Sequence, residues 1–246
     1  MKKLIIILIA LSFVSVCLAA SIQDMHKAAI ARRNVGGAET VWTDNFDGGA
    51  GQLDDRALWG SNVIYSNNTA RPNDLDLGSN ILTRSEYAGV KEYILFDSIP
   101  TDADYSVQLE LSASDEAADY VLSGCVRCAV GGTGMTGYYA DIRTSSDLFR
   151  FHRMDNGTPT ELLGFTAIAA QDWTAMHLVK LDISGSGTGT TLKLYISTDT
   201  SEGNLSLEET YVDDSGSAID AKGQAGIVTY NKDTYSIYID NFEVKD

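Results

Sequence analysis

Short runs of alternating apolar and polar residues, separated by clusters of Gly, Asn, Asp and Ser, fill the chain from Val41 to its end. Alternation with a period of two is typical of a β-strand with one buried face, because successive side chains point to opposite sides of the strand. The runs predict strands at 41–47, 62–66, 80–85, 92–97, 105–112, 120–130, 137–143, 148–154, 160–167, 176–183, 190–197, 207–212, 225–230 and 235–245. No segment in this region has a convincing helical pattern.

About fourteen strands with no helices between them predict an all-β domain over residues 41–246, built as a β-sandwich of two antiparallel sheets packed face to face. The length suits one such domain, since sandwiches of about 200–250 residues are common. A hairpin is expected around the glycine-rich connection 184–189, which is long for such a turn. It pairs Leu178, Leu181 and Ile183 with Leu192, Leu194 and Ile196.

Residues 1–19 have the pattern of a secretory signal peptide, in which two lysines precede an apolar run that ends in small residues. Cleavage after Ala19 or Ala20 predicts a secreted or extracytoplasmic protein. A transmembrane anchor is one alternative, but the run is short for that and no basic flank follows it closely. Lipidation at Cys17 is another, because a weak match to a bacterial lipobox precedes that residue.

Residues 20–40 are expected to form a short N-terminal helix or tether before the domain. Ser21 and Asp24 have the spacing of a capping box, and good helix formers continue to Arg33. The other interpretation of this segment is a mobile exported tail.

The chain is strongly acidic, with 34 Asp and Glu against 18 Lys and Arg and a formal net charge of −16. Loss of the leader with its two lysines leaves 16 basic residues and a net charge of −18. Such a chain has no electrostatic footprint for nucleic acid or for an anionic membrane surface. The charge also disfavours polyanionic glycans, which leaves a neutral glycan or a cell-surface partner.

The mature chain keeps two cysteines, Cys125 and Cys128, spaced C-x-x-C. In an exported protein this spacing suggests a disulfide, and elsewhere it suggests a metal or redox site. Both lie in an expected strand, however, where residues i and i+3 point to opposite faces with Cα atoms about 10 Å apart. We therefore expect two separately packed thiols.

The residue patterns of three regions of the chain, 40–59, 137–153 and 223–244, resemble those of the concanavalin A-like lectin/glucanase superfamily. The opening residues 40–48 with Leu53 and Trp59 are similar to the start of family 16 glycoside hydrolases. The middle segments, 137–143 and 148–153, resemble laminin-G-like modules, and 223–244 resembles the closing strands of the superfamily. The resemblance implies the jelly-roll fold and a packing role for Trp59 and Trp173.

The catalytic motif of family 16 is absent from the sequence. Retaining members of the family carry E-x-D-x-x-E on one strand, which places a nucleophile and an acid about 5–5.5 Å apart. The pairs Asp74/Asp76 and Asp102/Asp104 have part of this spacing, but both are interpreted as turn carboxylates. His152 is interpreted as a half-exposed strand residue rather than a base. No catalytic residue is therefore assigned. Whether the protein is an enzyme stays open, and the missing motif favours a protein without catalytic activity.

The resemblance also implies a structural Ca²⁺ where the first and last strands meet. Asp240 matches the position of the last-strand ligand, and the region that begins at Asp44 would supply the other oxygens. Carboxylate and carbonyl oxygens are the ligands that Ca²⁺ prefers. The alternative is that Asp240 only forms hydrogen bonds to a neighbouring strand.

Tyrosines that lie near Asn, Asp or Arg are candidate sugar-binding residues, because an amphipathic ring suits both the apolar face and the hydroxyls of a sugar. The candidates are Tyr65, Tyr87, Tyr93, Tyr230 and Tyr235. Ordinary strand composition also explains them, since Tyr is enriched in β-strands.

Together these features predict an exported, non-catalytic carbohydrate-binding or surface-recognition module. One alternative is a glycoside hydrolase from an outlying branch of the same superfamily. Another is a structural or adhesive cell-surface protein. A carboxylate pair across one sheet would favour the enzyme, whereas an aromatic strip without such a pair would favour the binding module.

Overall fold

The computed structural model describes residues 41–46, 51–52, 59, 63–65, 75–78, 81–84, 91–97, 99–115, 120–131, 134–231 and 236–246. Within these ranges the chain forms sixteen strands and three short 3₁₀ turns. The strands are β1 (Val41–Asp44), β2 (Gly51–Gln52), β3 (Val63–Tyr65), β4 (Leu75–Gly78), β5 (Ile81–Arg84), β6 (Lys91–Leu95), β7 (Tyr105–Ala113), β8 (Tyr120–Gly131), β9 (Gly134–Arg143), β10 (Leu148–Asp155), β11 (Thr158–Ala167), β12 (His177–Ser184), β13 (Thr190–Ile196), β14 (Ser206–Asp213), β15 (Gln224–Asn231) and β16 (Ile237–Lys245). The turns are Thr144–Ser146, Gly187–Gly189 and Glu202–Asn204.

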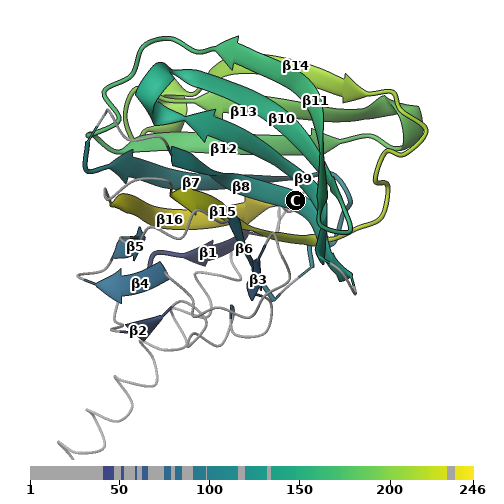
Figure 1. The fold of residues 1–246 in the computed structure, drawn as a ribbon, viewed down its shortest axis with the longest axis horizontal. Helices are drawn as coiled ribbons and strands as arrows, with labels where there is room; N and C mark the ends of the chain where they lie inside the picture. Colours follow the sequence, from purple (N-terminus) through teal and green to yellow (C-terminus); the bar gives the residue numbers. More distant parts are fainter. Residues whose placement is uncertain are drawn as a thin grey trace, which may run out of the picture. The chain divides into compact units, whose positions relative to one another are not determined.

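The described strands form two sheets. One has nine strands in the order β14-β13-β12-β7-β16-β5-β4-β2, with β1 also paired to β16, and the other has seven in the order β11-β10-β9-β8-β15-β6-β3. Figure 1 shows β8 to β11 of the second sheet lying over β7, β12 and β13 of the first. Because strands distant in sequence pair within each sheet, as β7 does with β16, the arrangement is the expected jelly-roll β-sandwich.

The hydrophobic core lies between the two sheets and follows the alternation of the sequence. Val107 and Leu109 of β7 are buried there against Val126 of β8 and Tyr138 of β9. The hairpin expected around 184–189 is confirmed as β12 and β13, with Leu181 opposite Leu194 and Ile183 opposite Leu192. The expected place of Leu178 opposite Ile196 is taken by Val179, because residues 179, 181 and 183 share the inner face. Each inward residue alternates with an outward one, so both sheets also present a second face.

Trp59 and Trp173 are both fully buried, as the sequence predicts. Trp59 packs edge-on against Phe96 and Phe242, with ring centroids 5.3 and 4.8 Å apart. Its indole Nε1 donates a hydrogen bond of 2.8 Å to Oδ2 of Asp44. A buried Trp normally needs such a partner for its N–H.

Two short strands were not expected from the sequence, β2 and β4. Asp76 lies within β4, so the interpretation of Asp74/Asp76 as turn carboxylates is wrong for Asp76. Asp102 and Asp104 lie in bends before β7, in agreement with the turn interpretation. Strands as short as β2 carry too few residues to establish a period of two.

A β-bulge in β8 places Cys125 and Cys128 on the same face, which corrects the expectation that they point to opposite faces. Arg127 has a left-handed backbone with φ of 50°. The register of β8 with β9 shifts between Val126 and Ala129, which gives β8 one residue more than its partner. Both thiols are buried and free, as expected, but in a shared cluster.

The Arg127 side chain is buried at one end of the sandwich, and its guanidinium donates to three backbone carbonyls. Nε donates to the oxygen of Ala103 at 2.9 Å, Nη1 to that of Ile219 at 2.8 Å and Nη2 to that of Gly185 at 2.6 Å. Nη2 also lies 3.2 Å from the carboxylate of Asp104. One cation thus joins three connections that are far apart in the sequence.

The expected leader 1–19 and tether 20–40 lie outside the described residues, so both stay predictions. Across the described ranges, the chain contains no helix of the length and apolar character needed to span a bilayer.

Candidate functional site

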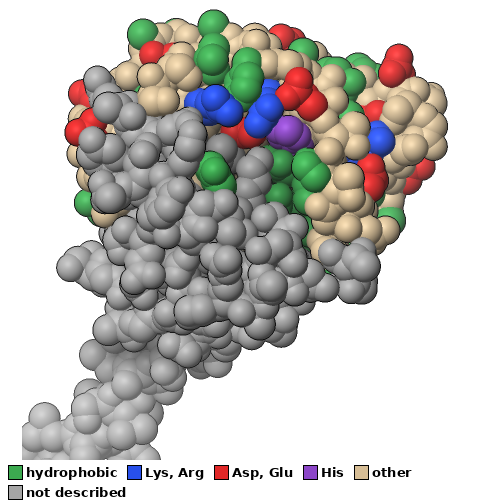
Figure 2. All heavy atoms as spheres, in the orientation of Figure 1, with side chains coloured by type: hydrophobic (Ala, Val, Ile, Leu, Met, Phe, Trp, Pro, Cys, Tyr) green, Lys and Arg blue, Asp and Glu red, His purple; other side chains and the backbone are tan. Residues whose placement is uncertain are grey.

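The outer face of the seven-stranded sheet carries a strip of charged and aromatic side chains. The strip lies on β9, β10 and β11, at one end of the sheet. Alternation turns Tyr138, Ala140 and Ile142 of β9 into the core. The residues between them, Tyr139 and Asp141, therefore face outwards. Figure 2 shows basic, acidic, histidine and hydrophobic side chains gathered on the face of the molecule that it views.

Strand register brings the members of this strip together. Arg150 of β10 lies opposite Asp141 of β9. In the neighbouring row, His152 lies opposite both Tyr139 of β9 and Glu161 of β11. We call these five residues, together with Arg143 and Phe165, the outer-face strip.

Arg150 is the centre of the charged contacts in the outer-face strip. Its Nε and Nη2 donate to Oδ2 of the fully buried Asp141 at 3.0 and 2.8 Å, and its Nη1 donates to Oε2 of Glu161 at 2.7 Å. Burial alone would lower the pKa of Arg150, but the hydrogen bonds and charges of Asp141 and Glu161 outweigh it and raise that pKa. The guanidinium is therefore a fixed cation that holds two carboxylates in place.

Phe165 of β11 provides the exposed aromatic surface of the outer-face strip, with 38% of its area accessible. The guanidinium carbons of Arg143 and Arg150 lie 4.2 and 4.3 Å from the centroid of its ring. These distances are those of cation–π contacts. The ring is therefore held in one orientation although it is partly exposed.

His152 is buried, with 5% of its area accessible, which corrects the expectation of a half-exposed strand residue. Its ring stacks on Tyr139 with centroids 4.9 Å apart and planes at 11°. Nε2 lies 3.4 Å from Oδ2 of Asp141, and neither ring nitrogen has a hydrogen-bond partner in the described part of the chain.

In the described part of the structure, the candidate tyrosines do not form one exposed surface. Tyr93 of β6 is 1% exposed and packs against Tyr139, with ring centroids 5.8 Å apart, so its ring does not face solvent as a platform would. Tyr230 is half-buried on β15. Tyr65 belongs to β3, but its side chain is outside the described part of the structure, as are Tyr87 and Tyr235 entirely.

The candidate metal ligands Asp44 and Asp240 lie on β1 and β16, two strands that pair as expected. Both carboxylate oxygens of Asp44 accept hydrogen bonds, Oδ1 from the backbone N–H of Phe46 and Oδ2 from Trp59. Oδ1 of Asp240 accepts from the N–H of Asn241 at 2.8 Å. The described residues contain no group of three or more His, Cys, Asp or Glu placed to hold a metal.

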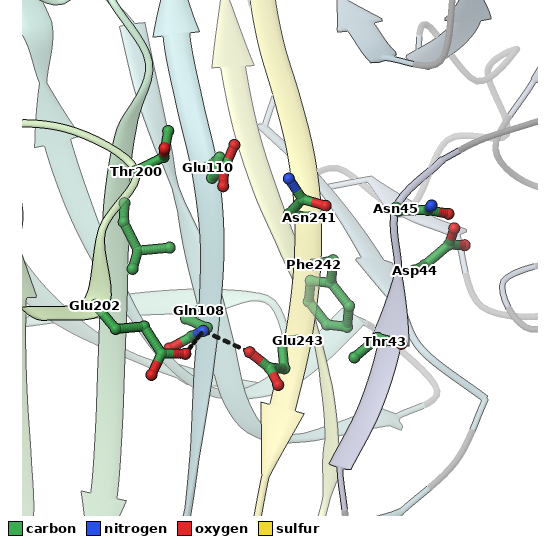
Figure 3. Close-up of a pocket in the computed structure, with 11 residues that line it drawn as sticks. Thr43, Asp44, Asn45, Gln108, Glu110, Thr200, Glu202, Asn241, Phe242 and Glu243 are labelled. Carbon is green, nitrogen blue, oxygen red and sulfur yellow. Dashed lines mark hydrogen bonds between the residues drawn. The ribbon is translucent and has the colours of Figure 1, made fainter. Parts of the chain in front are cut away.

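A pocket of about 280 Å³ lies on the outer face of the nine-stranded sheet, and its lining includes side chains of β1, β7 and β16. Figure 3 shows Glu202 and Glu243 pointing towards Gln108 from either side, with Glu110 set apart from them. Nε2 of Gln108 donates to Oε1 of Glu202 at 2.8 Å and to Oε2 of Glu243 at 2.5 Å. Lys245 bridges the same two oxygens at 2.5 and 3.1 Å.

The glutamates of this pocket have different protonation properties. Hydrogen bonds from Lys245 and Gln108 lower the pKa of Glu202. Burial raises the pKa of Glu110, and the nearby charge of Asp240 adds to this effect against a hydrogen bond from Asn241. Pairs of carboxylates whose pKa values move apart are found where one acts as an acid and the other as a base.

Sequence reasoning missed the outer-face strip and the glutamates of the pocket. The strip had a usable signal, because Asp141 and Arg143 are followed after a short turn by Arg150 and His152, all at alternating positions. Glu202 lies in a 3₁₀ turn outside the strands, so no periodic pattern points to it.

No family model matches the chain, and no curated protein matches it in sequence. Among solved structures, a β-glucanase from Bacillus licheniformis has a TM-score of 0.52 at 11% identity, over 86% of this chain and 99% of the other. The Ca²⁺-bound exoplasmic/lumenal domain of VIP36 has a TM-score of 0.52 at 10% identity, over 83% and 88%. Arcelin-5, a lectin-like defence protein from Phaseolus vulgaris, has a TM-score of 0.50 at 8% identity, over 84% and 97%. Identities this low establish similarity of fold and nothing more.

Proposed function

Since the chain has the concanavalin A-like lectin/glucanase fold, we propose that it is an exported carbohydrate-binding protein that recognises a glycan on the outer-face strip. The observation that carries the proposal is Phe165, an aromatic ring that is 38% exposed and fixed by two guanidinium groups. Sugar sites combine an aromatic surface with a few fixed polar groups. Arg150 and Glu161 supply such groups beside the ring, with 21% and 48% of their side chains exposed.

The charges of the outer-face strip support a neutral glycan as the ligand. The two guanidinium groups of Arg143 and Arg150 are balanced by the carboxylates of Asp141 and Glu161. The chain as a whole carries a net charge of −16, which would repel a polyanionic glycan. The lectin and glucanase names among the similar folds agree with a carbohydrate ligand. Export rests on the leader expected at residues 1–19.

Binding of neutral oligosaccharides to the full chain, first on a glycan array and then by calorimetry, tests this proposal. Phe165→Ala should weaken binding about tenfold or more, because aromatic contacts dominate such interfaces. Leu207→Ala is the matched control, since Leu207 is 49% exposed on β14 of the other sheet. The proposal fails if no glycan binds, or if Phe165→Ala and Leu207→Ala bind equally well.

A glycoside hydrolase is the second candidate, and the pocket with Glu110 and Glu202 is the observation that favours it. A retaining or inverting mechanism needs one carboxylic acid and one carboxylate, and the raised pKa of Glu110 and the lowered pKa of Glu202 suit these two roles. Release of reducing sugar from β-glucan tests this candidate. Activity that Glu110→Gln and Glu202→Gln both abolish would support it, and no release by the wild-type chain would reject it.

We also propose a structural Ca²⁺ at the junction of β1 and β16, with Asp240 and oxygens from the region of Asp44 as ligands. The pairing of these strands supports the location, and the Ca²⁺-bound VIP36 domain has a similar fold. Backbone carbonyls would have to supply most of the ligands, which Ca²⁺ accepts.

A further inference from the structure

The bulge at Arg127 brings two thiols to one place on the outer face of the seven-stranded sheet. In an unbroken strand Cys125 and Cys128 would face opposite sides. The extra residue of the bulge turns both side chains to the same face of the sheet. Both thiols therefore belong to one buried cluster with Tyr93, Tyr139 and others. Cys125 lies opposite Tyr139 of β9, and Sγ of Cys128 lies over Gly137, two residues earlier on the same face of β9. The two thiols are therefore neighbours on one face of the sheet.

Two methionines of the same cluster complete a set of four sulfur-bearing side chains. Met154 of β10 lies opposite Gly137 of β9. A Cβ atom on Gly137 would lie only 2.7 Å from Sγ of Cys128, so the cysteine sulfur fills the space above this glycine. No side chain of Gly137 separates Cys128 from Met154. Met135 lies two residues before Gly137 on the same face and in the same cluster.

The hydroxyl group of Tyr93 contacts one of these sulfur atoms. Its hydroxyl donates to Sδ of Met154 at 3.7 Å. Tyr93 and both cysteines belong to the same buried cluster. The hydroxyl group thus contacts a thioether inside the cluster that also holds the two thiols.

The chemistry of this cluster selects a class of metal ion. Thiolate and thioether sulfur are soft ligands that favour Cu(I), whereas the usual ligands of Zn²⁺ are thiolate, imidazole and carboxylate. The surroundings are apolar, since the cluster also contains Leu95 and Val228. A buried site should therefore be neutral once the metal is bound.

We propose that Cys125, Cys128, Met135 and Met154 form a binding site for one Cu(I) ion. One thiol gives up its proton to solvent and forms a sulfur–copper bond, while the second thiol and the thioethers bind through sulfur lone pairs. The charge of the ion balances that of the single thiolate, and no electron is transferred. The site is separate from Phe165 and does not depend on glycan binding.

Titration of the full, reduced chain with Cu(I) held by bicinchoninate tests the site. We expect transfer of one Cu(I) per chain and sulfur-only coordination in X-ray absorption. Cys128→Ser should weaken binding about 100-fold or more, since each ligand carries a large share of the affinity. Met154→Leu and Met135→Leu, which keep the side-chain volume, should each weaken it measurably. Met176→Leu is the matched control, because Met176 is half-buried outside the cluster.

Four outcomes would overturn the proposal. The first is no transfer to a wild-type chain that is folded by circular dichroism. The second is equal transfer to the wild type and to Cys128→Ser. The third is oxidation of the two thiols to a disulfide with no copper retained, in which case the pair is a redox site. Tighter retention of Zn²⁺ than of Cu(I) would reject the assigned class of metal.

Discussion

Arg150 and Asp141 lie directly opposite one another on β10 and β9, and two nitrogens of the guanidinium donate to a single carboxylate oxygen. Asp141 is fully buried, whereas 21% of the Arg150 side chain is exposed. Such an ion pair contributes to the stability of the fold mainly because the guanidinium compensates the charge of a buried carboxylate. It also fixes the position of the guanidinium next to Phe165, so it links the stability of the sheet to the proposed sugar site.

Arg150→Met should lower the free energy of unfolding by about 3 kcal/mol, because it removes the guanidinium from a buried carboxylate. Lys180→Met is the control, since Lys180 pairs with Asp182 at 3.0 Å where both side chains are about a quarter exposed. Its cost should stay below about 1 kcal/mol. Urea denaturation of both variants measures the difference, and equal losses would contradict the role given to Asp141.

The stability of the chain should fall in acid, partly because of Asp213. Burial works to raise the pKa of this carboxyl, but hydrogen bonds from Ser215, Arg153 and Tyr138 together outweigh it and hold the pKa below its usual value. A carboxyl with a lowered pKa in the folded state stabilises the fold above the unfolded-state pKa, about 3.9, and loses that contribution as the pH falls through the folded-state pKa.

Asp213→Asn should therefore flatten the dependence of unfolding free energy on pH below about pH 4. Asp214→Asn changes the net charge equally at the neighbouring exposed position and serves as the control. Chemical denaturation at a series of pH values provides the measurement. If both variants keep the slope of the wild type, Asp213 is not the titrating group.

Gly226→Ala should destabilise the sandwich by about 1–3 kcal/mol through overpacking. Gly226 lies on β15, opposite Leu95 of β6, and a Cβ atom there would come within 2.3 Å of the carbonyl oxygen of Ile94. Gly216→Ala is matched to it, because a Cβ atom at Gly216 has no heavy atom within 4 Å. The melting temperatures of the two variants measure the contrast, which would be absent if β6 and β15 could separate freely.

Ca²⁺ should raise the melting temperature if the proposed site at β1 and β16 exists. A ligand at 100 times its dissociation constant stabilises the fold by about 2.7 kcal/mol, which is a shift of several degrees for a domain of this size. Calorimetry with Ca²⁺ and with a chelator measures it, and Asp240→Asn should remove the difference while Asp214→Asn keeps it. An unchanged melting temperature in the wild type would exclude the ion.

The sequence was sufficient to predict the β-sandwich, and it predicted the strands of the second half of the chain most accurately. β7 to β16 lie within a few residues of the expected ranges, because long alternating runs specify both the strand and its buried face. The register of β12 with β13 was also predictable, since only one alignment pairs their apolar residues across the turn.

The outer-face strip and the thiol pair could not be predicted in the same way. The bulge requires φ of 50° at Arg127, a conformation that a glycine or asparagine would have suggested and an arginine does not. The burial of Tyr93 depends on packing against Tyr139, three strands away in the sheet order. Contacts of this kind become visible only when strand order and register are both known.

The three carbonyls that Arg127 holds have a consequence for how this protein can diversify. They come from Ala103, Gly185 and Ile219, in three different connections. Inserting residues into any of them would move a carbonyl away from a buried cation and take an acceptor from one of its N–H groups. Changes of loop length are therefore better tolerated elsewhere. Homologues should keep these three connections constant in length wherever they keep the arginine.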